Sequence, residues 1–170
     1  MSACTRYTRH IWKDFLAYGG HDAVSKGTLS IVRCTPGYVE ATLKIQKEQT
    51  NRLGGLHGGI ICSLVDTVGS LALTTKGIFQ TGVSTDIHTS FIRGAGTIGD
   101  TVRIEGRVLN MGKTLAYTET KLFHPETNKL LATGLHTKYI ANSHSHPQNV
   151  KFDETGDNVI EGSFEETESA

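Results

Sequence analysis

The chain has few of the features that mark several large protein classes. It contains 3 prolines in 170 residues and no stretch that approaches the ~18 consecutive apolar residues of a membrane-spanning helix. Its 3 cysteines lack the paired spacing of a metal site, which predicts reduced thiols in an intracellular protein, cytoplasmic or mitochondrial. No apolar signal-peptide core is present near the start, although the basic residues Arg6, Arg9 and Lys13 leave a mitochondrial presequence open.

Several catalytic motifs are also missing. There is no G-x-S-x-G turn for a nucleophilic serine, no H-E-x-x-H for zinc and no complete phosphate-binding P-loop. The histidines are spread over separate segments, so we expect neither a metal site nor a bound cofactor. No basic and aromatic platform indicates a nucleic-acid partner. Serine hydrolases, zinc enzymes and nucleic-acid-binding proteins are therefore disfavoured.

The net charge of zero conceals an uneven distribution. Of 17 acids and 17 bases, 7 acids but only 1 base follow residue 140, so residues 1–140 carry 16 bases and 10 acids. That surplus suits an anionic ligand, although a solvated basic surface explains it equally well. The composition predicts an N-terminal helix and linker over residues 1–27, a folded domain over 28–140 and a disordered acidic tail over 141–170.

Hydrophobic periodicity predicts an α+β domain. Apolar residues at helical spacing predict an amphipathic helix over about 5–18 and one long helix over about 57–76. Period-two alternation predicts strands at about 28–34, 38–46, 82–92, 100–110, 114–123 and 129–140. Because short turns join the last four strands, we expect an antiparallel sheet of about six strands with the long helix packed on one face.

The most informative segment begins the long helix. Gly58 and Gly59 follow His57 there, and glycines at a helix start leave backbone N–H groups unshielded at the positive end of the helix dipole, which suits a developing oxyanion. A tight strand-to-helix turn is an equally simple explanation of the glycines. Asp66 lies about two turns further on and is the only acid between Glu48 and Asp86. An acid isolated among small and apolar residues is typical of a general base or nucleophile rather than of a solvated surface.

These residues carry a family resemblance. Asn51, the Leu56–Gly59 segment, Asp66, Gly82–Asp86 and Gly112–Tyr117 together resemble the hotdog-fold acyl-CoA thioesterases, in particular their PaaI-like branch. The resemblance covers roughly residues 28–140. It implies the hotdog fold, in which an antiparallel sheet wraps a long helix. It also implies a homodimer, commonly paired into a homotetramer, in which Gly58 and Asp66 of one chain serve two different sites.

The same resemblance implies an activity, the hydrolysis of acyl-CoA to a free acid and coenzyme A in fatty acid metabolism, with coenzyme A as part of the substrate. It implies that the Gly58 N–H and Asn51 polarise the thioester carbonyl, while His57 supports that end. It further implies that Asp66 is the base or nucleophile and that Ser84 positions the water. The residues it implies for coenzyme A binding are Asp86, Arg93, Gly112, Lys113, Thr114 and Lys138.

Two alternatives stay open from the sequence. One is a hotdog protein that binds acyl-CoA without turning it over. The other is a hotdog hydratase or dehydratase, a chemistry that usually needs a histidine paired with an acid and for which His57 and Asp66 are the candidates. The isolated position of Asp66 favours a thioesterase over a binding protein, and the spacing of Asn51 and Ser84 favours it over a hydratase.

Overall fold

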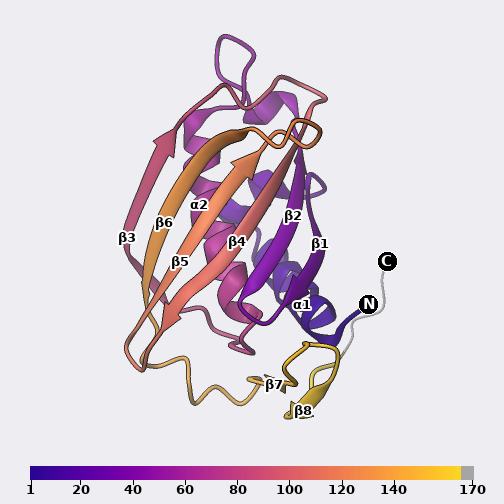
Figure 1. The fold of residues 1–170 in the computed structure, drawn as a ribbon, viewed down its shortest axis with the longest axis vertical. Coiled ribbons are helices and arrows are strands. Elements are labelled where there is room, and N and C mark those ends of the chain that lie inside the picture. The colour runs from indigo at the N-terminus through magenta and orange to yellow at the C-terminus, as the bar shows by residue number, and fades with distance from the viewer. Residues whose placement is uncertain (166–170) are drawn as a thin grey trace.

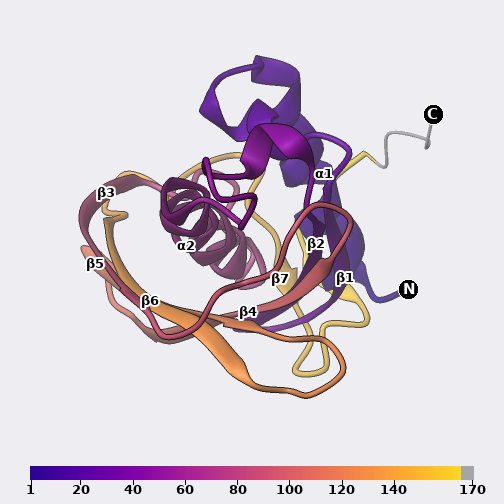
Figure 2. The ribbon, with the colours of Figure 1, turned by 90° about the horizontal axis from the view of Figure 1, so that it is seen from above.

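Six antiparallel strands form one sheet that curves around a long helix, as Figures 1 and 2 show. The computed structural model describes residues 1–165. Its helices are α1 (Ala3–Tyr18) and α2 (Gly58–Thr74), with short 3-10 turns η1 (His21–Ser25) and η2 (Lys47–Gln49). Its strands are β1 (Leu29–Thr35), β2 (Tyr38–Lys44), β3 (Val83–Phe91), β4 (Thr101–Met111), β5 (Leu115–Phe123), β6 (Leu130–Tyr139), β7 (Lys151–Phe152) and β8 (Val159–Glu161). The predicted α+β architecture is confirmed, and no helix of the described residues is long and apolar enough to cross a membrane.

The sheet lies close to α2 because two of its strands carry glycine where the helix crosses them. A Cβ atom at Gly134 of β6 would lie 2.5 Å from Val65 Cγ2, and one at Gly106 of β4 would lie 2.9 Å from Val68 Cγ1. Val65 and Val68 are completely buried, and burying such a side chain contributes about 1.5–3 kcal/mol. The helix is therefore fixed on the sheet, which sets its residues against those of β6 and β3.

The strand order β1-β2-β4-β5-β6-β3 places β3 at an edge, beside β6 and not beside β4. The short turns of the sequence predict a hairpin between β3 and β4, and that prediction is wrong. Residues 92–100 instead cross the N-terminal end of α2, where the Leu56 N–H donates to the Gly96 carbonyl at 2.9 Å. This crossing carries the chain from the edge of the sheet to its other half.

The two edges of the sheet are finished differently. At β1, Arg9 of α1 donates to the carbonyls of Ile31 at 3.0 Å and Val32 at 3.4 Å, and the Cys34 N–H donates to the Thr5 hydroxyl at 2.8 Å. At β3, no hydrogen bond within residues 1–165 uses the edge that faces away from β6. Most side chains of β3 are also exposed, so this edge is open along its length.

Residues 141–165 pack against α1, although their composition predicts a disordered tail. Phe152 and Phe164 lie edge-on against the ring of Tyr7 in α1, with ring centroids 5.7 and 5.1 Å away. The prediction is wrong for this segment because a few well-placed aromatic residues are enough when a folded helix offers them an apolar surface. Residues 166–170 of the predicted tail lie outside the described residues.

Candidate active site

The start of α2 leaves one backbone donor unused. His57 is the N-cap residue, and its Nδ1 accepts a hydrogen bond from the Gly59 N–H at 2.8 Å. The N–H groups of Ile60 and Ile61 donate to the His57 carbonyl at 3.0 and 3.2 Å. The Gly58 N–H has no acceptor among the described residues, so the predicted oxyanion donor is free and stands at the positive end of a 17-residue helix.

Asn51 holds the loop that leads into this helix. Its Oδ1 accepts hydrogen bonds from the Leu53 N–H at 2.9 Å and the Gly55 N–H at 3.3 Å, and the Asn51 N–H donates to the Gly55 carbonyl at 2.8 Å. These bonds close a tight turn in front of α2. The side-chain oxygen of Asn51 is thus occupied by the turn, which leaves its amide nitrogen as the group that can reach a ligand.

Asp66 meets two side chains from neighbouring strands. Its Oδ1 lies 3.4 Å from Ser84 Oγ on β3 and 3.5 Å from His136 Nε2 on β6. Ser84 Oγ and His136 Nε2 lie 2.8 Å apart. Since 48% of the Asp66 side chain is exposed, the carboxylate lies at the surface of one chain, with the serine and histidine behind it.

A bulge in β3 turns Ser84 toward α2. Strict alternation would place Ser84 on the same face as Asp86, away from the helix. The register of β3 and β6 shifts between these two residues, so Ser84 pairs with Lys138 while Asp86 pairs with the next residue, Thr137. The extra residue, Thr85, lets Ser84 face α2 while Asp86 stays on the outer face of the sheet.

His136 is a member of this group that the sequence analysis did not assign. It is 1% exposed, and burial, followed by the positive charge of Lys138, lowers its pKa to about 4. The imidazole is therefore neutral at neutral pH. Its Nε2 lies 2.8 Å from Ser84 Oγ, so a hydrogen bond joins the imidazole to the serine. The signal in the sequence is alternation, because Gly134, His136 and Lys138 share the face of β6 that turns toward α2.

Lys138, which the resemblance implies for coenzyme A binding, does not lie at the mouth of the site. It is 4% exposed and points from β6 under α2, where its ammonium donates to Ser70 Oγ at 2.7 Å and lies 3.9 Å from Asp66 Oδ1. Burial lowers the pKa of Lys138, and the charges of Asp66 and Asp22 oppose that change. Such a position excludes contact with a phosphate in solvent, so this assignment is corrected.

Asp86 lies on the outer face of β3, and the remaining residues implied for coenzyme A binding lie at two ends of the sheet. Arg93 donates to the Leu130 carbonyl at the start of β6 at 2.7 Å, whereas Thr114, in the exposed turn with Gly112 and Lys113, accepts from the Ile140 N–H beyond the end of β6 at 2.8 Å. A 10-residue strand is about 30 Å long. One chain therefore does not bring Arg93 and Lys113 together.

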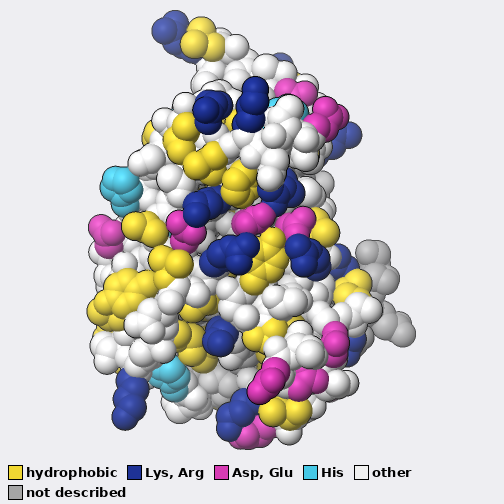
Figure 3. Space-filling model, viewed as in Figure 1, with side chains coloured by type: hydrophobic (Ala, Val, Ile, Leu, Met, Phe, Trp, Pro, Cys, Tyr) yellow, Lys and Arg dark blue, Asp and Glu magenta, His cyan; other side chains and the backbone are white. Residues whose placement is uncertain are grey.

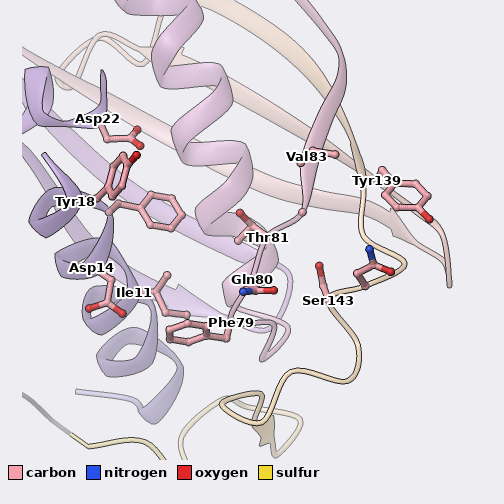
Figure 4. A pocket seen from close by; sticks show the side chains of 13 residues that line it. Ile11, Asp14, Tyr18, Asp22, Phe79, Gln80, Thr81, Val83, Tyr139 and Ser143 are labelled. Atoms are coloured by element: carbon pink, nitrogen blue, oxygen red, sulfur yellow. The ribbon is translucent and has the colours of Figure 1, made fainter. Parts of the chain in front are cut away.

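A cavity of about 660 Å³ lies between α1 and the start of β3. Ile11 and Phe15 of α1 line one side, and Val83, which precedes Ser84, lines the other (Figure 4). Asp22, also at its wall, accepts a hydrogen bond from the hydroxyl of Thr67, the residue after Asp66, at 2.8 Å. The cavity thus borders residues adjacent to both Asp66 and Ser84.

The chain belongs to the thioesterase superfamily, and its sheet wrapped around a long helix is the hotdog fold of that family. The family model of that description matches residues 53–131. A protein of Schizosaccharomyces pombe is 38% identical over 84% of this chain and 88% of its own length. Human acyl-coenzyme A thioesterase 13 is 34% identical over 84% of this chain and 100% of its own. The crystal structure of thioesterase superfamily member 2 from Mus musculus matches with a TM-score of 0.73 at 32% identity, over 82% of this chain and 99% of that one. The predicted family and fold are confirmed.

Proposed function

We propose that the protein is an acyl-CoA thioesterase that hydrolyses acyl-CoA to a free acid and coenzyme A. The observation that carries the proposal is the pairing, on one helix, of the unused Gly58 N–H with the Asp66 carboxylate beside Ser84. The first group suits a thioester oxygen that gains negative charge, and the second suits the activation of water. The names of the most similar relatives support the same activity.

The reaction follows from these positions. The thioester carbonyl oxygen accepts the Gly58 N–H, aided by the Asn51 amide, while His57 fixes the helix start that aims this donor. Ser84 holds a water whose proton passes to Asp66 as its oxygen bonds to the carbonyl carbon. The carbon–sulfur bond then breaks, and the thiolate of coenzyme A takes up the proton. Direct attack by the Asp66 carboxylate is the variant in which water enters at the second step.

One chain does not complete this site. Gly58 and Asp66 are eight residues apart on one helix, which is about 12 Å at 1.5 Å per residue, whereas reacting groups must approach to about 3–3.5 Å. A second copy in antiparallel orientation brings Gly58 of one chain to Asp66 of the other. The open edge of β3 supports this arrangement, because unpaired edge groups can pair with a second copy. We therefore propose a homodimer with two shared sites.

The outer face of the sheet supports a further pairing of dimers into a homotetramer. Hydrophobic side chains gather on the β3 side of this face, while charged side chains occupy its centre (Figure 3). The exposed members include Tyr117, Leu135 and Tyr139, which are 40%, 47% and 39% exposed. Exposed apolar patches of this kind are typical of contacts between proteins.

The substrate would lie across the dimer. Antiparallel chains bring the Arg93 end of one β6 toward the Lys113 end of its partner, so that these cations, with the turn of Gly112 and Thr114, contact the phosphates of coenzyme A. The acyl group enters the apolar cavity between α1 and Val83. We place this activity in fatty acid metabolism, in the cytoplasm or the mitochondrion.

A hydratase or dehydratase is less well supported. It would need His57 and Asp66 to act on one carbon, but His57 uses Nδ1 to cap α2 and lies nine residues from Asp66 along the chain. Even in a dimer, the capping bond leaves only Nε2 for chemistry. The other alternative is a protein that binds acyl-CoA without hydrolysing it. Measurement of thiol release separates it from a thioesterase.

The test follows thiol release from medium- and long-chain acyl-CoAs. In Gly58→Pro the donor is removed while the helix start is kept, because proline suits the first helical position and His57 is already extended. We expect this variant to lose about 10²–10³ in kcat, and Asp66→Ala to lose at least about 10². Glu126→Ala, in an exposed turn, is the control and should match the wild type. A wild-type protein that binds acyl-CoA but releases no thiol at any chain length contradicts the proposal.

A further inference from the structure

A buried lysine lies directly behind the proposed catalytic acid. Lys138 is 4% exposed, and its ammonium is held by the Ser70 hydroxyl at 2.7 Å. A buried charge is unfavourable unless an opposite charge lies near it. Among residues 1–165, Asp66 is the carboxylate within 4.0 Å of this ammonium, at 3.9 Å. Lys138 and Asp66 therefore balance one another across the face between β6 and α2.

Two basic side chains face Asp66, and burial lowers the pKa of both. His136 lies closer to Asp66 Oδ1, at 3.5 Å, but its pKa is lowered to about 4. The pKa of Lys138 is lowered from a much higher ordinary value of 10.5, so Lys138 is the more basic of the two groups. The remaining charged groups around this cluster are Asp22 of η1, which acts on Lys138, and Asp86 of β3, which acts on His136.

We propose that Lys138 is a positioning residue that holds the Asp66 carboxylate in its orientation toward Ser84. The inference rests on the proposed function, in which Asp66 must carry a negative charge to accept a proton or to attack. Ser70 supports this arrangement, because its hydroxyl hydrogen-bonds the ammonium and lies on the same helix as Asp66. The lysine touches neither substrate nor water at the reacting centre and acts only through Asp66.

The kinetic consequences differ from those of a lysine that binds coenzyme A. Loss of a substrate contact raises KM, whereas loss of a group that positions the base lowers kcat. In Lys138→Met we therefore expect kcat to fall by about tenfold or more, with KM within about twofold of the wild type.

The experiment measures kcat and KM of the protein with one acyl-CoA. Ser70→Ala should lower kcat in the same way by a smaller amount. Lys121→Met is the matched control, because Lys121 is a surface lysine of β5 that pairs with Glu119 at 2.9 Å. A rise in KM with kcat unchanged in Lys138→Met would assign the lysine to substrate binding and overturn the proposal. Unchanged values of both kcat and KM would also overturn it.

A second measurement does not depend on turnover. Asp66→Asn leaves Lys138 buried without its counter-charge, so we expect it to lower the urea midpoint of unfolding in the wild-type background and to have much less effect in Lys138→Met. Circular dichroism verifies that each variant is folded. Equal shifts in both backgrounds would overturn the pairing of the two residues, even in an active enzyme. Absence of hydrolysis by the wild type would instead overturn the proposed function, and with it the catalytic role of Lys138.

Discussion

The two edges of the sheet are built from similar strands but end in opposite ways. At β1, Arg9 and Thr5 of α1 hydrogen-bond the outward backbone groups of the strand. At β3, the described residues provide no such cover, and the strand carries Ser84 of the candidate site. An uncovered edge invites pairing with any other strand. Covering β1 and leaving β3 open therefore favours association at β3, the edge at which we propose that a second copy completes the site.

The largest expected effect comes from preventing a second copy from pairing at the open edge of β3. Ile87 lies opposite His136 in register and is 39% exposed, so Ile87→Lys places a like charge from each chain at the proposed junction. We expect monomers in sedimentation velocity and a loss of thiol release of about 10² or more, because neither shared site can assemble. Val32→Lys, at the covered edge and 44% exposed in the wild type, should stay dimeric and active. A monomeric and fully active Ile87→Lys variant would show that one chain is sufficient.

The next effect is a pH dependence of stability that we expect on the β3 side of the sheet and not at the β1 edge. The pKa of His136, on the strand that pairs with β3, is about 4 in the folded chain against 6.5 as its ordinary value. Between these values the unfolded chain binds a proton that the folded chain does not, so the free energy of unfolding decreases as pH falls through this window. The shift corresponds to about 3 kcal/mol, and it makes no contribution to the pH dependence above about pH 6.5.

Urea unfolding at several pH values measures this dependence. His136→Gln should flatten it between about pH 6.5 and 4, whereas the exposed His88→Gln on β3 should retain it. If both variants follow the wild-type curve, the acid sensitivity has another origin. The covered edge offers a contrast, since it is held by an arginine, which stays charged throughout this range.

The smallest expected effect comes from uncovering β1. Arg9→Met removes charged hydrogen bonds to two carbonyls of the strand and should destabilise the fold by about 2 kcal/mol. Activity per folded dimer should be unchanged, and light scattering should detect slow association through the exposed edge. Arg33→Met is the matched control, because Arg33 is an exposed arginine of β1 whose surface contacts, an ion pair with Glu40 and a position over the Tyr38 ring, contribute little. Equal losses of stability in the two variants would mean that Arg9 does not protect the edge.

Periodicity predicted the helices and most strands well because each of these elements buries one continuous face. It could not predict the placement of Ser84, because one extra residue at Thr85 reverses which side chains turn inward, and alternation alone does not reveal a bulge. Lys138 was misplaced for a different reason. A lysine is expected at the surface, and its partners under α2, Ser70 and Asp66, are distant in sequence.

The prediction of disorder for the acidic C-terminal segment was wrong for another reason. Its low apolar content is typical of disorder when the segment is considered alone. The surface that receives Phe152 and Phe164 belongs to α1, more than 130 residues earlier in the chain, and local composition carries no information about such a partner. The position of β3 at the edge was missed similarly, because residues 92–100 look like a turn although they cross α2.

One helix that carries both Gly58 and Asp66 has a consequence for mixtures of defective chains. If the two groups act in different sites, a chain lacking the acid and a chain lacking the N–H donor are each inactive as homodimers. Their mixed dimer combines the intact donor of one with the intact acid of the other and regains one of its two sites. Two inactive preparations, unfolded together and refolded, would then complement each other, a behaviour that no monomeric hydrolase can show.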